Sequence, residues 1–235
     1  MERKIYQKLL EWKNNNERKP LILQGARQVG KTYIVNLFGG NEYANTVYCN
    51  FEKDLGLHEF FNELTPSNII KKISLYKRKP IIENQTLLIF DEVQACPKAI
   101  TSLKYFNEEA NNYDIIALGS LLGVSINREN FSFPVGKVQF MTLHPMDFEE
   151  YLLAKDEKAL IKMIRDSFQS NKQLHDVFHQ RALDYYKEYL FVGGMPEVVE
   201  EYNKSKNPEL VRIIQNNILE SYFNDMSKYN KQTEI

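Results

Sequence analysis

A short apolar segment that runs straight into a glycine-bounded turn places the strongest constraint on this chain. LILQ at 21–24 is followed by GARQVGKT at 25–32, which has the spacing G-x-x-x-x-G-K-[ST]. Glycines let the backbone curl after a strand so that successive N–H groups point at one place. A following helix adds the positive end of its dipole. The turn therefore predicts a phosphate-binding loop between a β-strand and an α-helix.

The residues of this loop have distinct expected roles. Lys31 is expected to reach the β- and γ-phosphates, and Thr32 to offer its hydroxyl to Mg²⁺. The alternative is an ordinary strand-to-helix turn in which Lys31 is solvated; the flanking apolar and helical patterns favour the phosphate loop. The residues expected to contact the nucleotide are consecutive: Gly25, Ala26, Arg27, Gln28, Val29, Gly30, Lys31, Thr32 and Tyr33.

A second apolar segment ends on two carboxylates. LLIF at 87–90 is followed by Asp91 and Glu92. Asp91 is expected to hold Mg²⁺, and Glu92 to orient and deprotonate the attacking water. The alternative is that both only cap a helix at 97–111. Two acids at the end of an apolar strand are costly unless a cation meets them, which favours the metal and water roles.

A third apolar segment, DIIALG at 114–119, ends on Ser120. A polar residue at this strand tip is placed to touch the γ-phosphate or the attacking water. The plain alternative is a turn serine. The sequence therefore predicts a catalytic role for Ser120 beside Lys31 and Glu92.

The first half of the chain alternates apolar segments with helical patterns, which is typical of a parallel sheet covered on both faces. The expected strands are 21–24, 46–51, 86–90, 114–119 and 137–143, and the expected helices are 31–38, 66–78 and 97–111. The extra strand before the acidic one, together with the glutamate, indicates the additional-strand, catalytic-glutamate branch of P-loop proteins. The predicted fold class is α/β, a three-layer P-loop NTPase core with sheet order 5-1-4-3-2.

The second half changes character. From Met146 the sequence has long segments with helical periodicity at 147–168, 174–190 and 207–229, without a convincing strand. FVGGMP at 191–196 combines two glycines with a proline and predicts a turn. We therefore expect an all-helical extension after the core.

Composition excludes some classes of function. Lys and Arg number 30 against 31 Asp and Glu, a net charge of −1 that gives no general reason to expect nucleic acid or an anionic membrane as partner. The chain has two cysteines and no apolar run of about 18 residues, so a cytoplasmic protein without a membrane span is expected. The Asn-Lys pairs of the sequence lack the aspartate with which GTPases recognise guanine, which argues against a GTPase. The sequence near 120–140 lacks the arginine-rich lid of small-molecule kinases, so hydrolysis is favoured over phosphoryl transfer to a small molecule.

Five motifs stand in order along the chain: RKPLILQGARQVGKT, LLIFDEVQ, ALGSLL, VGKVQFMTLHPMDFEEYL and YLFVGGMPEVV. Together they resemble a group of AAA-like P-loop ATPases of bacteria and archaea, close to the signal-transduction ATPases with numerous domains. The resemblance covers essentially the whole chain. In that group the core is followed by a second conserved module of unsettled function, so the chain looks like the N-terminal part of such a protein.

The resemblance implies two domains, and the chain departs from the group at one position. Residues 1–145 would form the AAA-like core with an N-terminal helix, and 146–235 a helical lid or linker and the start of a truncated second module. Gly30, Lys31 and Thr32 match the phosphate loop of the group; Asp91 and Glu92 match its metal and water sites, and Ser120 its sensor strand. Where the group carries an arginine, this chain has Lys137, which lacks the planar fork of a guanidinium. Arg27 and Arg128 are the other candidates for an arginine finger.

The sequence thus predicts Mg²⁺-dependent binding and hydrolysis of ATP that drive a conformational switch. The competing hypothesis is an ATP-responsive module that binds protein or nucleic acid with negligible turnover; a pure binder has no need of Glu92. The expected ligands are ATP and Mg²⁺. A protein partner or self-association fits the resemblance, whereas a nucleic-acid partner has no support in the sequence.

Overall fold

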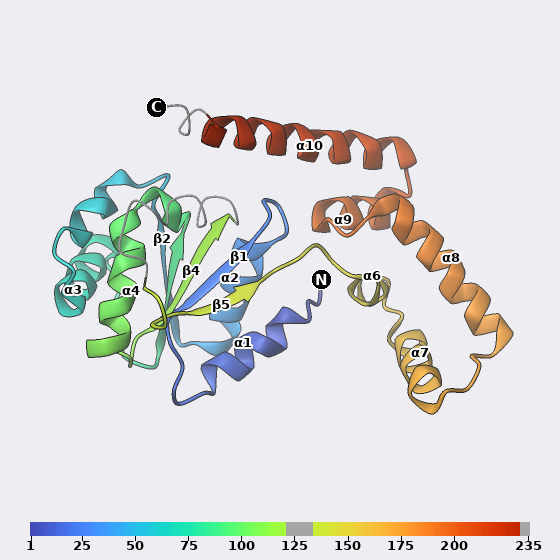
Figure 1. The fold of residues 1–235 in the computed structure, drawn as a ribbon, viewed down its shortest axis with the longest axis horizontal. Coiled ribbons are helices and arrows are strands. Elements are labelled where there is room, and N and C mark those ends of the chain that lie inside the picture. The colour runs from blue at the N-terminus through green and yellow to red at the C-terminus, as the bar shows by residue number, and fades with distance from the viewer. Residues whose placement is uncertain (121–133, 231–235) are drawn as a thin grey trace. The chain divides into compact units, whose positions relative to one another are not determined.

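The computed structural model describes residues 1–120 and 134–230 (Figure 1). The chain divides into two compact units. One unit is Ile5–Leu143, and the other combines Met1–Lys4 with the residues from His144 onward.

The first unit is built on a five-stranded sheet whose neighbouring strands all pair in parallel. Its strands are β1 (Leu21–Gly25), β2 (Asn45–Asn50), β3 (Thr86–Asp91), β4 (Asp114–Ser120) and β5 (Gln139–Thr142). They lie in the order β2-β3-β4-β1-β5, which is the predicted order read from the other edge. The α/β class and the strand order predicted from the sequence are confirmed.

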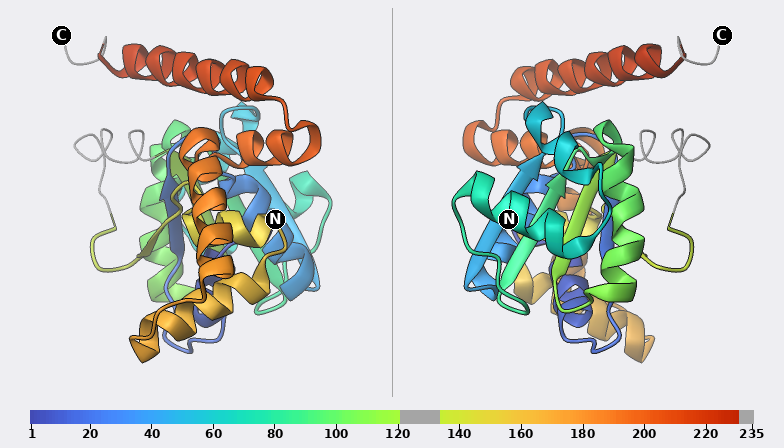
Figure 2. Two further views of the ribbon diagram at one scale, coloured as in Figure 1. Left: turned by 90° about the vertical axis from the view of Figure 1, so that its right-hand side faces the viewer. Right: turned by 90° about the vertical axis from the view of Figure 1, so that its left-hand side faces the viewer.

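Helices cover both faces of this sheet. They are α1 (Ile5–Lys13), α2 (Lys31–Glu42), α3 (Pro66–Lys77) and α4 (Pro97–Glu109), with short 3₁₀ helices η1 (Leu55–Phe61) and η2 (Val93–Ala95). Apolar side chains of α3 and α4 form one core with alternate residues of the strands. These two helices lie on one face of the sheet and α2 lies on the other (Figures 1 and 2). α1 joins α2 through an edge-to-face contact between Tyr6 and Phe38, with ring centroids 5.6 Å apart.

Local sequence explains where these elements begin and end. β3 and β4 are buried along their whole length, as near-continuous apolar strands in a covered parallel sheet must be. α3 and α4 each begin with a proline, whose fixed φ suits the first turn of a helix and whose missing N–H would have no partner there. α3 stops at Arg78, which takes the left-handed conformation of a helix C-cap.

The second unit is helical in the part that the structure describes. Its helices are α6 (Phe148–Ala154), α7 (Lys158–Ser170), α8 (Asp176–Val192), α9 (Pro196–Ser205) and α10 (Pro208–Asn230). The N-terminal residues belong to this unit through Arg3, whose guanidinium pairs with the buried Glu150 carboxylate at 3.1 Å. In the described residues no helix is both long and apolar enough to cross a membrane.

The prediction of one helix over 147–168 is wrong. α6 ends at Ala154 and α7 begins at Lys158. Between them Asp156 adopts a left-handed conformation with φ of 59°, which aspartate tolerates better than most residues. The apolar pattern continues across this break, which is why periodicity alone misses it. α9 is also absent from the sequence prediction, which treats 191–196 as a turn and expects the next helix only at 207–229.

Candidate functional site

Residues 26–30 join β1 to α2 in a tight loop. Gln28 and Gly30 have left-handed backbones, with φ angles of 63° and 92°. Glycine adopts this conformation without steric cost, whereas at Gln28 it costs on the order of 1 kcal/mol. Val29, between them, is fully buried and anchors the loop to the core. Alternation of ordinary and left-handed residues turns successive N–H groups to one side, the geometry of an anion-binding nest.

The Lys31 side chain lies over this loop. Its Nζ donates to the backbone carbonyl oxygens of Gly25 at 2.9 Å and Ala26 at 2.8 Å. Burial lowers the pKa of Lys31, and the nearby carboxylates of Glu92 and Asp91 oppose that effect. One cation is therefore held between the loop carbonyls and the acidic end of β3.

β3 brings Asp91 to the same edge of the sheet, because the strands are parallel and their carboxyl ends meet there (Figure 1). Asp91 is 5% exposed. Its Oδ2 accepts hydrogen bonds from the Thr32 hydroxyl at 3.0 Å and from the Tyr48 hydroxyl, and its Oδ1 accepts from the Glu92 backbone N–H at 2.9 Å. Three donors from three segments offset the cost of burying this charge.

Thr32 and Asp91 form a donor set that suits Mg²⁺. A hydroxyl oxygen and a carboxylate oxygen stand 3.0 Å apart. Mg²⁺ prefers oxygen ligands and is held by one or two carboxylates together with waters and substrate phosphates. Among the described residues, no group of three or more His, Cys, Asp or Glu side chains could hold a metal ion without such help.

Glu92 follows β3 directly and has a left-handed backbone with φ of 51°. Its Oε2 accepts a hydrogen bond from the Gln94 side-chain amide at 2.5 Å. Sparsely populated backbone conformations of this kind cluster at functional sites, where the surrounding structure enforces them. The turn at Glu92 therefore separates its side chain from that of Asp91 and gives each its own hydrogen-bond partner.

The remaining predicted site residues lie on the elements expected of them. Ser120 ends β4, is 6% exposed, and stands opposite Gly25 in the strand register. Arg27 is half-buried and Gln28 exposed on the loop. Tyr33, in the first turn of α2, is 59% exposed.

Lys137 lies near the amino-terminal ends of the strands, whereas the loop lies at their carboxyl ends. It precedes β5, whose Gln139 pairs with Leu21 at the start of β1, whereas the loop follows the end of β1. Its Nζ pairs with Glu108 Oε1 at 2.9 Å. Lys137 therefore does not contact the loop of its own chain. Arg128, the other distant candidate for a finger, lies outside the described residues.

Two residues that sequence reasoning missed belong to the same cluster. Tyr48 and Asn50 lie on β2, next to β3, and Asn50 stands opposite Asp91 in the register. Burial raises the pKa of Tyr48 to about 12, with the Asn50 bond lowering it and the Asp91 bond raising it. The signal was present in the sequence: alternate residues of TVYCNF are polar, and the strand ends beside the acidic one.

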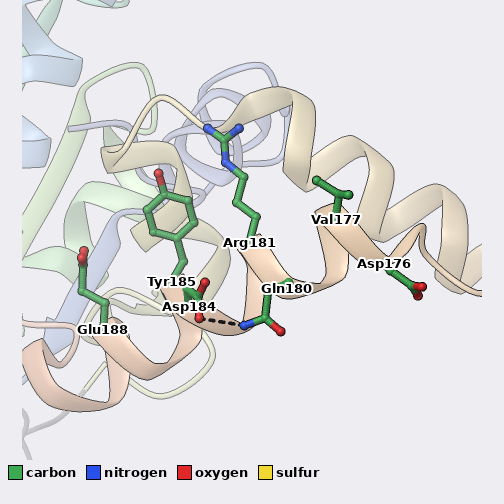
Figure 3. A pocket seen from close by; sticks show the side chains of 7 residues that line it. All are labelled: Asp176, Val177, Gln180, Arg181, Asp184, Tyr185 and Glu188. Carbon is green, nitrogen blue, oxygen red and sulfur yellow. Dashed lines mark hydrogen bonds between the residues drawn. The ribbon is translucent and has the colours of Figure 1, made fainter.

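A separate hollow of about 660 Å³ runs along α8 (Figure 3). Three carboxylates and one guanidinium line it, so its net charge is negative and it does not suit a phosphate. Arg181 and the Tyr185 hydroxyl both bond to Glu157, and the Gln180 amide donates to Asp184 at 3.0 Å. The lining residues are Asp176, Val177, Gln180, Arg181, Asp184, Tyr185 and Glu188.

Comparison with solved structures finds similar chains among nucleotide-bound and DNA-bound proteins. The chain is similar to ORC2 of Aeropyrum pernix in ADPNP–ADP complexes, at 14% identity and TM-score 0.38, covering 76% of this chain and 64% of that one. It is similar to AMPPCP-bound DnaA of Aquifex aeolicus, at 16% identity and TM-score 0.48, covering 86% and 59%. It is also similar to Drosophila ORC bound to DNA, at 18% identity and TM-score 0.44, covering 79% and 53%. The chain thus spans less than two thirds of each of these chains.

Comparison with family models separates the two halves of the sequence. Residues 183–235 match a domain of unknown function, DUF8612. No curated protein matches the chain. Residues 17–152, more than half of the 235, match the AAA domain model. The matched residues contain all five strands of the sheet, the loop after β1 and the acidic end of β3. The chain therefore belongs to the AAA domain family of P-loop ATPases, which confirms the resemblance seen in its motifs.

Proposed function

We propose that the protein binds ATP with Mg²⁺ and hydrolyses it to ADP and phosphate. The observation that carries this proposal is the meeting of four side chains at one sheet edge. Lys31 and Thr32 begin α2 beside the loop; Asp91 ends β3, and Glu92 follows it directly. A cation, a metal-binding hydroxyl and two carboxylates are the set that phosphoryl transfer to water requires.

Each residue has a defined part in this proposal. The loop N–H groups and the Lys31 ammonium stabilise negative charge on the β- and γ-phosphates. Thr32 and Asp91 hold Mg²⁺, which when bound neutralises charge on the β- and γ-oxygens. Glu92 accepts a proton from water as the water oxygen bonds to the γ-phosphorus and the bond to the β-phosphate oxygen breaks. Ser120 is placed to contact the γ-phosphate or that water.

The regulatory part of the proposal concerns both halves of the chain. Residues 1–145 form the ATPase core and 146–235 a helical lid or linker with the start of a second module. Loss of the γ-phosphate changes contacts at the loop edge, which is a common switch in P-loop proteins. In this proposal the switch moves the helical region through Ser120 and the loops near 121–136, of which residues 121–133 lie outside the described residues.

The test is phosphate release by the wild-type protein and two variants. We expect Lys31→Ala to lose ATP binding and turnover together. We expect Glu92→Gln to keep ATP binding but to lose turnover by about 10²- to 10⁴-fold, the usual contribution of a general base. Lys71→Ala and Glu109→Gln are the matched controls, because both side chains are exposed on helices of the same unit, α3 and α4.

Both outcomes can be read from binding and turnover together. If the wild-type protein binds ATP but releases phosphate no faster than Glu92→Gln, a nucleotide-responsive binding module is favoured instead. Absence of ATP binding by the folded wild-type protein would contradict the whole proposal. Duplex DNA added to the same assay tests a nucleic-acid partner, which would raise turnover in a salt-dependent manner.

A further inference from the structure

Outside the residues expected to bind or hydrolyse ATP, two consecutive hydrogen bonds connect side chains of β2 to Asp91. Tyr48 is 37% exposed, yet its hydroxyl turns to the Asp91 carboxylate rather than to solvent. Its strand neighbours Val47 and Cys49 point to the other face and are buried in the core with α3 and α4. The Tyr48 ring is therefore not a core-packing residue of that face.

The orientation of the Asn50 amide determines which group donates in each of these hydrogen bonds. The Asn50 Oδ1 accepts from the backbone N–H groups of Glu52 at 3.1 Å and Lys53 at 2.8 Å. Its amide nitrogen is thereby turned to Tyr48 and donates to the phenol oxygen at 3.2 Å. Because the phenol has a single proton and already accepts from Asn50, that proton is left for Asp91.

The Asp91 carboxylate is held at both oxygens. Oδ2 accepts from Tyr48 and Thr32, and Oδ1 accepts from the Glu92 N–H. In the proposed function Thr32 turns its hydroxyl to Mg²⁺. The phenol of Tyr48 is then a side-chain donor that still orients Asp91. Hydrogen bonds that orient a metal-binding carboxylate are part of what sets metal affinity.

We propose that Tyr48, held by Asn50, is a positioning residue that orients Asp91 toward Mg²⁺. This inference rests on the proposed function of the loop and deepens it. Tyr48 acts through Asp91 and contacts neither phosphate nor water. Its contribution is to the tightening of nucleotide binding by Mg²⁺, and it leaves the metal-free affinity unchanged.

The test measures binding of AMPPNP by calorimetry with Mg²⁺ and with EDTA. The ratio of the two affinities is the coupling between metal and nucleotide. We expect Tyr48→Phe to lower this ratio by about tenfold, the lower end of the usual range for an outer-shell partner of a metal ligand. Affinity in EDTA should stay at the wild-type value.

Tyr76→Phe is the matched control. The Tyr76 hydroxyl donates to Asp54 at 2.8 Å, so this variant also removes a tyrosine–aspartate hydrogen bond from the same unit, but on α3. Its coupling ratio should equal that of the wild type. Far-UV circular dichroism of both variants checks that they fold.

A second comparison separates positioning from direct contact with the nucleotide. In an Asp91→Asn background, Tyr48→Phe should have no further effect on the coupling ratio, because the residue through which it acts has changed. A wild-type ratio near one would overturn the proposed function and this inference with it. A large wild-type ratio that Tyr48→Phe leaves unchanged would overturn this inference alone, and an undiminished effect in Asp91→Asn would assign Tyr48 a direct contact instead.

Discussion

At the scale of single residues, Gly25 shows how closely the loop is packed. It ends β1, and the first side-chain atom of any other residue there would meet the backbone oxygen of Leu143 at 2.3 Å. Real side chains essentially never approach another atom so closely, and the atom met here belongs to the backbone rather than to the end of a flexible side chain. The first glycine of the motif is therefore required by packing, because its own backbone is not left-handed.

We expect Gly25→Ala to destabilise the first unit by about 1–3 kcal/mol, as overpacking of a core commonly does. Gly40→Ala is the matched control, because nothing lies within 4 Å of the added carbon and Gly40 is exposed in α2. That change should stabilise by up to about 1 kcal/mol, the helix-propensity gap between glycine and alanine. Chemical denaturation of both variants measures this, and equal stabilities would contradict the packing argument.

At the scale of elements, α6 illustrates a helix that begins with a complete cap. The Asp147 side chain accepts from the Glu150 backbone N–H at 2.8 Å, and the Glu150 side chain accepts from the Asp147 N–H at 3.3 Å. Lys4 adds an ion pair to Asp147 at 2.7 Å. Burial raises the pKa of Asp147, but the Lys4 hydrogen bond and the backbone N–H groups outweigh it, so the net pKa is lowered.

We expect Asp147→Ala to lower the free energy of unfolding by about 1 kcal/mol at neutral pH, the usual cost of losing an N-cap. Because the folded pKa lies below the unfolded one, this stabilisation is complete above the unfolded value of about 4 and is lost as the pH falls through the folded value. The difference between wild type and variant should therefore shrink in acid. Denaturation at pH 7 and pH 3 measures it.

Asp166→Ala is the control for that experiment, since Asp166 is exposed inside α7 and caps no helix. Its stability should match or slightly exceed that of the wild type at both pH values. A gap for Asp147→Ala that stays constant from pH 7 to pH 3 would contradict the assigned role of the ionised carboxylate.

At the scale of the whole molecule, the two units carry different probes. The single tryptophan, Trp12, is 2% exposed in α1 and donates to the Lys19 carbonyl at 2.8 Å, so its fluorescence reports on the first unit. Helices α6 to α10 make up most of the other unit and dominate its far-UV circular dichroism. In the proposed function, nucleotide bound at the loop stabilises the first unit.

We therefore expect MgATP to raise the unfolding midpoint seen by Trp12 fluorescence. A ligand at a hundred times its Kd adds about 2.7 kcal/mol to the stability of the state that binds it. Lys31→Ala is the control and should show no shift. A Trp12 midpoint that MgATP leaves unchanged in the wild-type protein would contradict nucleotide binding at the loop.

Local pattern was enough for most of the core. Apolar segments bounded by turns marked the strands, and the spacing of Gly25, Gly30 and Lys31 marked the loop; the sheet order then followed from the class of P-loop protein. These features depend on residues close together in sequence. The catalytic and metal roles of Lys31, Thr32, Asp91, Glu92 and Ser120 stay predictions, although the structure brings these residues to one sheet edge.

Features that depend on distant residues were beyond such reasoning. The break between α6 and α7 rests on Asp156 and on the pairing of Glu157 with Arg181 of α8. The failure of Lys137 to reach the loop follows from the direction of β5 beside β1.

The sequence by itself determined the α/β core and the tight loop after β1, because backbone curl and apolar strands are encoded by neighbouring residues. Only the tertiary structure decided that Asn50 and Tyr48 hold Asp91, because that contact needs β2 and β3 paired in one register across about forty residues of intervening chain.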